Sequence, residues 1–78
     1  MKKEKDLEQK YRELSSRLYN CQKAAEQTPN AETFVELAIT YEKLGLFYYA
    51  MDDPVNAQTC FLKSYIVCKS IFQQADAA

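Results

Sequence analysis

Few side chains in this sequence have the types and spacing that catalysis or metal binding requires. The chain contains no histidine, so the commonest general base and metal ligand is missing. Its three cysteines, Cys21, Cys60 and Cys68, lack the C-x-x-C spacing of a zinc or redox site. Asp52 and Asp53 are adjacent carboxylates, but Asp53 precedes a proline and is better explained as a helix cap than as a metal ligand. We therefore expect no catalytic residue, no metal and no cofactor, and we predict that the chain is not an enzyme.

Size and charge narrow the classes of function further. A chain of 78 residues forms one small domain, whose hydrophobic core is near the lower size limit for stable folding. Burying a second surface, on a partner or on a copy of itself, would therefore stabilise it. Ten basic and eleven acidic residues give a net charge of −1, which does not favour binding to nucleic acid or to an anionic membrane. The odd number of cysteines predicts reduced thiols in a cytoplasmic protein, and we expect them to be small buried side chains.

Two short segments that disfavour helix divide the chain into three predicted helices. These segments are "TPN" at 28–30 and "DDP" at 52–54. In each, a side-chain acceptor lies next to a proline, so Thr28 or Asn30 is expected to cap the second helix and Asp53 to cap the third. The prediction is an all-α domain over residues 1–78 with helices at about 4–27, 30–51 and 54–74.

Apolar residues form five stripes on these helices. Helix 4–27 has one seam at heptad spacing: Leu7, Tyr11, Leu14, Leu18, Cys21 and Ala25. Helix 30–51 has two opposed stripes, one with Phe34, Leu37, Tyr41, Leu44 and Tyr48 and one with Val35, Ile39, Leu46, Tyr49 and Ala50. Helix 54–74 has a stripe with Ala57, Phe61, Ser64, Tyr65, Cys68 and Phe72 and another with Val55, Thr59, Leu62 and Ile66. We expect the middle helix to be covered on both sides, which uses four stripes and leaves the last one free.

The segment around the single glycine resembles a tetratricopeptide repeat. That signature places aromatic, Leu-Gly and small residues at fixed spacing, and this chain matches it with Tyr41, Leu44, Gly45, Tyr48, Ala57, Phe61 and Ser64. The resemblance covers about 38–71 and departs at Lys69, where the family usually has proline. It implies a right-angled or antiparallel helical array. The alternative is a simple three-helix bundle. Independently, glycine inside a helix is unfavourable, so we expect Gly45 to allow a close approach of the small residues Ala57 and Ser64 on the third helix.

The resemblance also implies where a partner would bind. In tetratricopeptide proteins the first helix of each pair lines a groove for peptides or partner helices. The matching positions are Ile39, Glu42, Leu46, Tyr49 and Ala50, and they are apolar apart from the one acid. Such a groove suits an amphipathic helix better than a charged C-terminus. If the first helix fills this groove, the free stripe of the third helix, with Val55, Leu62 and Ile66, becomes the expected binding face.

Two hypotheses of function follow. The first is a small adaptor or chaperone-like protein that binds an apolar helix or peptide of another protein, and the family resemblance extends this to a co-chaperone of a bacterial secretion system. The second is a structural protein that associates with copies of itself through the first helix or the free stripe. The aromatic run Phe47, Tyr48 and Tyr49 is a third feature, but without a basic groove it does not favour nucleic-acid binding.

Overall fold

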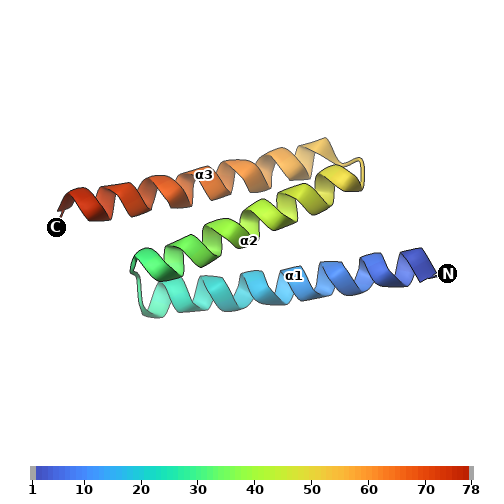
Figure 1. Ribbon diagram of the computed structural model, residues 1–78, viewed down its shortest axis with the longest axis horizontal. Helices are drawn as coiled ribbons and strands as arrows, with labels where there is room; N and C mark the ends of the chain where they lie inside the picture. Colours follow the sequence, from blue (N-terminus) through green and yellow to red (C-terminus); the bar gives the residue numbers. More distant parts are fainter. Residues whose placement is uncertain (1, 78) are drawn as a thin grey trace.

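The computed structural model describes residues 2–77, and the side chains of residues 4–73. The chain forms three helices, α1 (Lys2–Gln27), α2 (Ala31–Ala50) and α3 (Pro54–Ala77), and no strand occurs within the described range. The predicted all-α class with three helices is therefore confirmed. Successive helices run in opposite directions, and α2 crosses diagonally between α1 and α3, so the two ends of the chain lie at opposite ends of the molecule (Figure 1).

The first turn is fixed by a reciprocal cap at Asn30. The backbone N–H of Thr33 donates to Asn30 Oδ1 at 2.9 Å, and the backbone N–H of Asn30 donates to Thr33 Oγ1 at 3.1 Å. The Thr33 hydroxyl also donates to the carbonyl of Thr28 at 2.8 Å. Of the two caps left open by the sequence, Asn30 is the one that the structure uses, because this arrangement satisfies two backbone donors at once.

The second turn uses both aspartates. Asp52 has a positive φ of 61°, and the backbone N–H groups of Asp52 and Asp53 donate to the carbonyls of Tyr49 and Tyr48 at 3.1 and 2.9 Å. This pair of bonds is the Schellman arrangement that ends a helix, with aspartate in the position where glycine is usual. Asp53 then caps α3, since its Oδ1 accepts the backbone N–H of Asn56 at 3.2 Å. The turn thus uses the backbone of Asp52 and the carboxylate of Asp53.

The three helices form an open array instead of a closed bundle. Helices α1 and α3 each pack on α2, and their backbones do not approach one another anywhere in the described residues. The molecule measures 51 × 23 × 12 Å, so it is long and about twice as wide as it is thick. Its radius of gyration is 13.9 Å, whereas a compact domain of this length has about 11.5 Å. A closed three-helix bundle, in which every helix contacts the other two, does not describe it.

Close packing is concentrated between α2 and α3. Ala57 is 2% exposed and Gly45 is buried. A Cβ atom built on Gly45 would lie 2.6 Å from Cε1 of Phe61, so the ring of Phe61 occupies the space that a side chain at 45 would need. One turn away from Phe61, the hydroxyl of Ser64 donates to the backbone carbonyl of Ala38 at 2.9 Å. The missing side chain therefore does allow the expected close approach. The aromatic ring of Phe61 takes part in it, in addition to the small residues that were expected.

The total accessible surface is large for the mass of the chain. It is 6093 Å² for 9.0 kDa. Folded monomers of this mass expose about 4,900 Å², which leaves an excess of roughly 1,200 Å². An elongated array with one central helix accounts for this excess, because α1 and α3 each bury only one flank.

Candidate protein-binding surface

One of the two predicted stripes of α2 is uncovered. Val35, Ile39, Leu46 and Tyr49 are 43–70% exposed, and Glu42 and Ala50 on the same face are exposed too. The expectation that α2 is covered on both sides is therefore wrong. The buried residues of α2 occupy a single broad arc that serves α1 and α3 together: Leu37, Ala38, Thr40, Tyr41, Leu44 and Gly45. The uncovered set of Val35, Ile39, Leu46 and Tyr49 is called the α2 outer stripe below.

The free edge of α3 is exposed as well. Val55, Leu62 and Ile66 are 73%, 58% and 53% exposed. They point away from α2, because Ala57 and Ser64, which contact α2, lie on the other side of the helix. Both α2 and α3 thus leave an apolar stripe uncovered. The prediction that only the last stripe of α3 is free is therefore wrong.

The side of α3 that faces α2 differs in part from the prediction. Ala57 and Ser64 do face α2, but Tyr65 and Phe72 are exposed at 64% and 73%, and Cys68 is exposed. Val67 takes their place, packing against the buried cluster at the other end of α2. A row of buried and partly buried residues on α3 follows alternating spacings of three and four: Ala57, Cys60, Ser64, Val67 and Ile71. Tyr65 and Phe72 lie to one side of this row. Tyr65 and Phe72 therefore add to the exposed apolar residues of α3.

The seam of α1 is buried over only part of its length. Leu14, Cys21 and Ala25 are buried and Leu18 is partly buried, but Leu7 and Tyr11 are exposed. Tyr11 nevertheless contacts α2, since its ring lies 5.9 Å from that of Phe47 and 6.3 Å from that of Tyr48. Phe47, which the sequence left between stripes, is thus part of an aromatic cluster. The α1 seam packs within the chain, which is one of the two arrangements predicted for it.

A groove runs along one side of this seam between α1 and α2. It has a volume of about 500 Å³. Its floor is apolar: Leu7, Leu14, Leu46, Phe47 and Ala50. Its rim is charged: Lys10, Glu13, Arg17 and Lys43. We call it the basic groove. Leu46 and Ala50 were predicted to bind a partner, whereas the α1 residues and Lys43 were not, because helical periodicity does not say which side of α1 lies next to the α2 outer stripe.

A second hollow lies on the other side of the same seam and has the opposite charge. Its volume is about 660 Å³. Leu7 and Phe47 are shared with the basic groove, Tyr11 and Met51 complete the apolar lining, and the charged residues are Glu4, Glu8 and Arg12. Leu7 and Phe47 therefore form a wall with cations on one side and mostly carboxylates on the other.

Two side chains in the described part of the chain have shifted pKa values, Tyr48 and Cys60. The pKa of Tyr48 is raised to about 12, chiefly because the Tyr11 side chain hydrogen-bonds to its protonated hydroxyl, and secondarily because Tyr48 is partly buried. Burial also raises the pKa of the Cys60 thiol, which disfavours its thiolate form. No group of three or more His, Cys, Asp or Glu side chains in the described part of the chain is placed to hold a metal ion.

The three thiols have different surroundings. All are unpaired: Cys21 is buried, Cys60 is partly buried and Cys68 is exposed. The expectation that all three are buried therefore holds for Cys21 alone.

Within residues 2–77, no helix combines the length and the apolar character needed to cross a bilayer.

Comparisons with protein-family models, with curated proteins and with solved structures found no match to this chain. The role of the surface therefore rests on the chemistry of its own residues.

Proposed function

We propose that this protein is a non-enzymatic interaction module that binds an apolar helix of another protein. The observation that carries the proposal is the uncovered apolar surface: the α2 outer stripe is exposed, as are Tyr65 and Phe72 of α3, in a chain whose total surface exceeds that of a compact monomer by roughly 1,200 Å². A standard protein–protein interface buries about 800 Å² on each partner. The excess is thus large enough to form one such interface.

The shape of the surface favours a helix as the ligand. The α2 outer stripe runs along one helix with neighbours on both flanks, so the exposed face is long, narrow and apolar. An amphipathic helix presents a matching stripe at i, i+3, i+4 and i+7 spacing. We infer an adaptor or chaperone-like role in a cytoplasmic setting, which the three unpaired thiols favour.

The tetratricopeptide resemblance is part of this proposal. Six of the seven signature residues, including Gly45, Ala57 and Ser64, are buried or partly buried, and Phe61 lies against Gly45 across the α2–α3 interface. This packing supports the repeat interpretation. The secretion-system co-chaperone role is the specific form that the resemblance favours, and it depends on that resemblance.

The test compares two double variants of equal charge. In one, Ile39→Glu and Leu46→Glu place carboxylates in the α2 outer stripe. In the other, Ser16→Glu and Asn20→Glu add the same charge at exposed polar positions of α1. The partner recovered with the native chain is identified by mass spectrometry, produced separately, and its Kd is measured for each variant by isothermal titration calorimetry.

We expect the stripe variant to weaken binding by at least about 100-fold, since burying a carboxylate in an apolar contact costs several kcal/mol. The control variant should bind like the wild type. Circular dichroism checks that both remain helical. Equal binding by all three proteins would contradict the proposal for this surface. A stable dimer of the wild type in light scattering, lost in the stripe variant, would instead assign the surface to self-association.

A further inference from the structure

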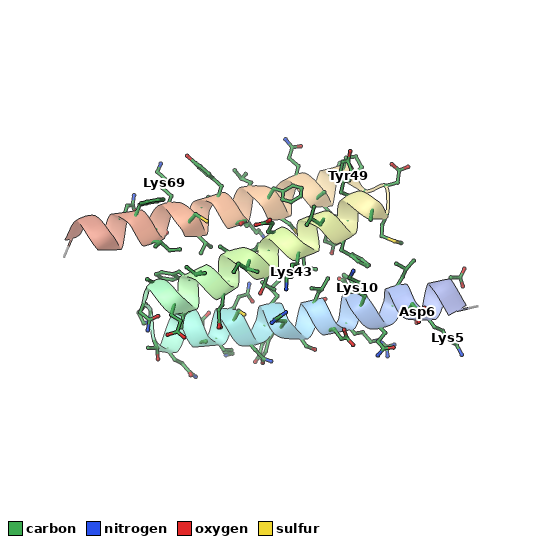
Figure 2. The ribbon with its side chains drawn as sticks, in the orientation of Figure 1. Lys5, Asp6, Lys10, Lys43, Tyr49 and Lys69 are labelled. Carbon is green, nitrogen blue, oxygen red and sulfur yellow. The ribbon has the colours of Figure 1, made fainter. Side chains whose placement is uncertain are left out.

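The basic groove has an excess of positive charge over an apolar floor. Lys10, Arg17 and Lys43 lie on its rim against one carboxylate, that of Glu13. The side-chain amide of Gln9 donates to Glu13 Oε1 at 3.3 Å, but this amide is neutral, so the rim keeps three cations against one carboxylate. Figure 2 shows Lys10 and Lys43 on facing sides of the space between α1 and α2. A ligand in the groove would therefore lie between cations supplied by both helices.

The hollow across the Leu7–Phe47 wall provides an internal comparison. Its charged residues are Glu4, Glu8 and Arg12, so carboxylates outnumber cations there. An acidic ligand is attracted to the basic groove and repelled from this hollow, because opposite charges attract at short range and like charges repel. The two sides of one seam thus differ in the sign of the ligand that they favour.

We propose that the basic groove receives an amphipathic helix whose apolar stripe is flanked by aspartate or glutamate residues. This inference rests on the proposed function and specifies the chemistry of the partner. The α1 residues that line the groove extend from Leu7 to Arg17, which is roughly 15 Å of helix. The occupant is therefore a helix of about three turns.

A second copy of this chain does not fit the groove as well. The helix edge that a copy could insert is that of α3, with Val55, Leu62 and Ile66 exposed. This edge lies beside Lys63 and Lys69, and residues 54–75 contain no aspartate or glutamate. The α2 outer stripe of a copy is flanked by its own α1 and α3, so it cannot enter a groove as a separate helix. Charge and shape together favour a different protein.

The test uses two designed peptides that differ only in charge. Both are hydrocarbon-stapled helices of about three turns with the same leucine stripe, and the flanking positions are all glutamate in one and all lysine in the other. Their Kd values for the full-length chain are measured by fluorescence anisotropy at low and at high salt. We expect the glutamate peptide to bind about tenfold more tightly at low salt, with the preference shrinking as salt screens the charges.

Two charge-reversal variants locate the site. Lys10→Glu with Lys43→Glu reverses the rim, and we expect it to remove the preference for the glutamate peptide. Lys5→Glu with Lys69→Glu makes the same change in net charge at side chains that point away from the groove (Figure 2), and it should preserve the preference. Leu46→Glu, at the floor of the groove, should weaken both peptides by about tenfold or more.

Three outcomes would overturn the inference. Equal binding of the two peptides by the wild type would show that the groove does not select charge, while the proposed function would stand if Leu46→Glu still weakened the binding of both. An equal loss of preference in both charge-reversal variants would place the effect in net charge instead of this site. Failure of both peptides to bind would exclude a helix in the groove, and the partner titration of the stripe variant would then decide the proposed function independently.

Discussion

The two ends of the α1–α2 seam differ in how completely they are packed. At the end next to the first turn, Cys21, Ala25, Leu37 and Tyr41 form a buried cluster, with Leu18, Phe34 and Val67 packed around it. At the other end, near the start of α1, Leu7 and Tyr11 are exposed and hollows lie on both sides of Phe47. We call these the closed end and the open end of the seam.

The difference follows from the direction of α2. Figure 1 shows α2 close to α1 at the first turn and diverging from it toward the second turn, where it approaches α3. At the closed end, Val67 of α3 joins residues of α1 and α2, so three helices exclude water from one cluster. At the open end, two helices that diverge cannot fill the space between them. One seam therefore holds the fold together at one end and leaves a ligand-sized groove at the other.

Replacing Tyr41 by alanine should have the largest effect. Tyr41 is 8% exposed, its hydroxyl accepts a hydrogen bond from Gln22 Nε2 at 3.0 Å, and the Lys63 ammonium lies 5.9 Å from its ring centre. Loss of a buried aromatic side chain costs about 3–5 kcal/mol, which is a large part of the stability of a domain this size. We expect urea denaturation to show this loss, or a chain that is no longer folded.

Tyr11→Ala is the matched change at the open end. Tyr11 is 43% exposed and its contacts are with the rings of Phe47 and Tyr48. We expect a loss of only about 1 kcal/mol, the magnitude of an aromatic pair. Similar losses for the two tyrosine variants would mean that the ends do not differ in stability, and the distinction between them would fail.

Gly45→Ala tests whether close packing extends from the seam to the α2–α3 interface. Alanine favours helix over glycine by about 1 kcal/mol, but its Cβ would lie within 2.9 Å of three ring atoms of Phe61. We expect a net loss of about 1 kcal/mol in the wild type, because the ring must move. In a Phe61→Ala background the same change should stabilise the protein by about 1 kcal/mol.

The measurement is a double-mutant cycle from denaturation curves of the four proteins. The sign of the Gly45→Ala effect should reverse between the two backgrounds. If alanine stabilises the wild type as well, Phe61 moves aside at little cost, and the α2–α3 interface is as adaptable as the open end.

Local sequence signals predicted the helices and the turns, because each depends on near neighbours. Proline and a side-chain acceptor mark both helix starts, and Asn30 and Asp53 do cap as expected. The position of Gly45 inside a helix also indicated a close helix contact, since a glycine there is otherwise unfavourable. The left-handed conformation of Asp52 was not predicted, since aspartate tolerates it but does not require it.

The coverage of the helices could not be predicted in the same way. Apolar periodicity shows that α2 has two stripes, but it does not show whether α1 and α3 share one arc or take opposite sides. They share one arc, so Ile39 and Leu46 are exposed. The basic groove combines Lys10 and Arg17 of α1 with Lys43 of α2, and no spacing along the chain relates these helices to one another.

The smallest expected effect is an alkaline loss of stability at the open end. The pKa of Tyr48 is raised from 10.0 to about 12, and the Tyr11 hydrogen bond is its first cause. A raised folded-state pKa means that the protonated hydroxyl is favoured in the fold, so the contribution to stability is complete below pH 10 and is lost as the pH rises toward 12.

In Tyr11→Phe the pKa of Tyr48 should return toward its ordinary value, and less stability should be lost over the same interval. Tyrosinate absorbance titrations and denaturation midpoints of the two proteins across this range would measure both effects, and because the other tyrosines and the lysines titrate in both proteins, the comparison lies in the difference between the curves. Identical curves would mean that Tyr11 and Tyr48 are not coupled, and that the open end is joined by ring contacts without the hydroxyl interaction.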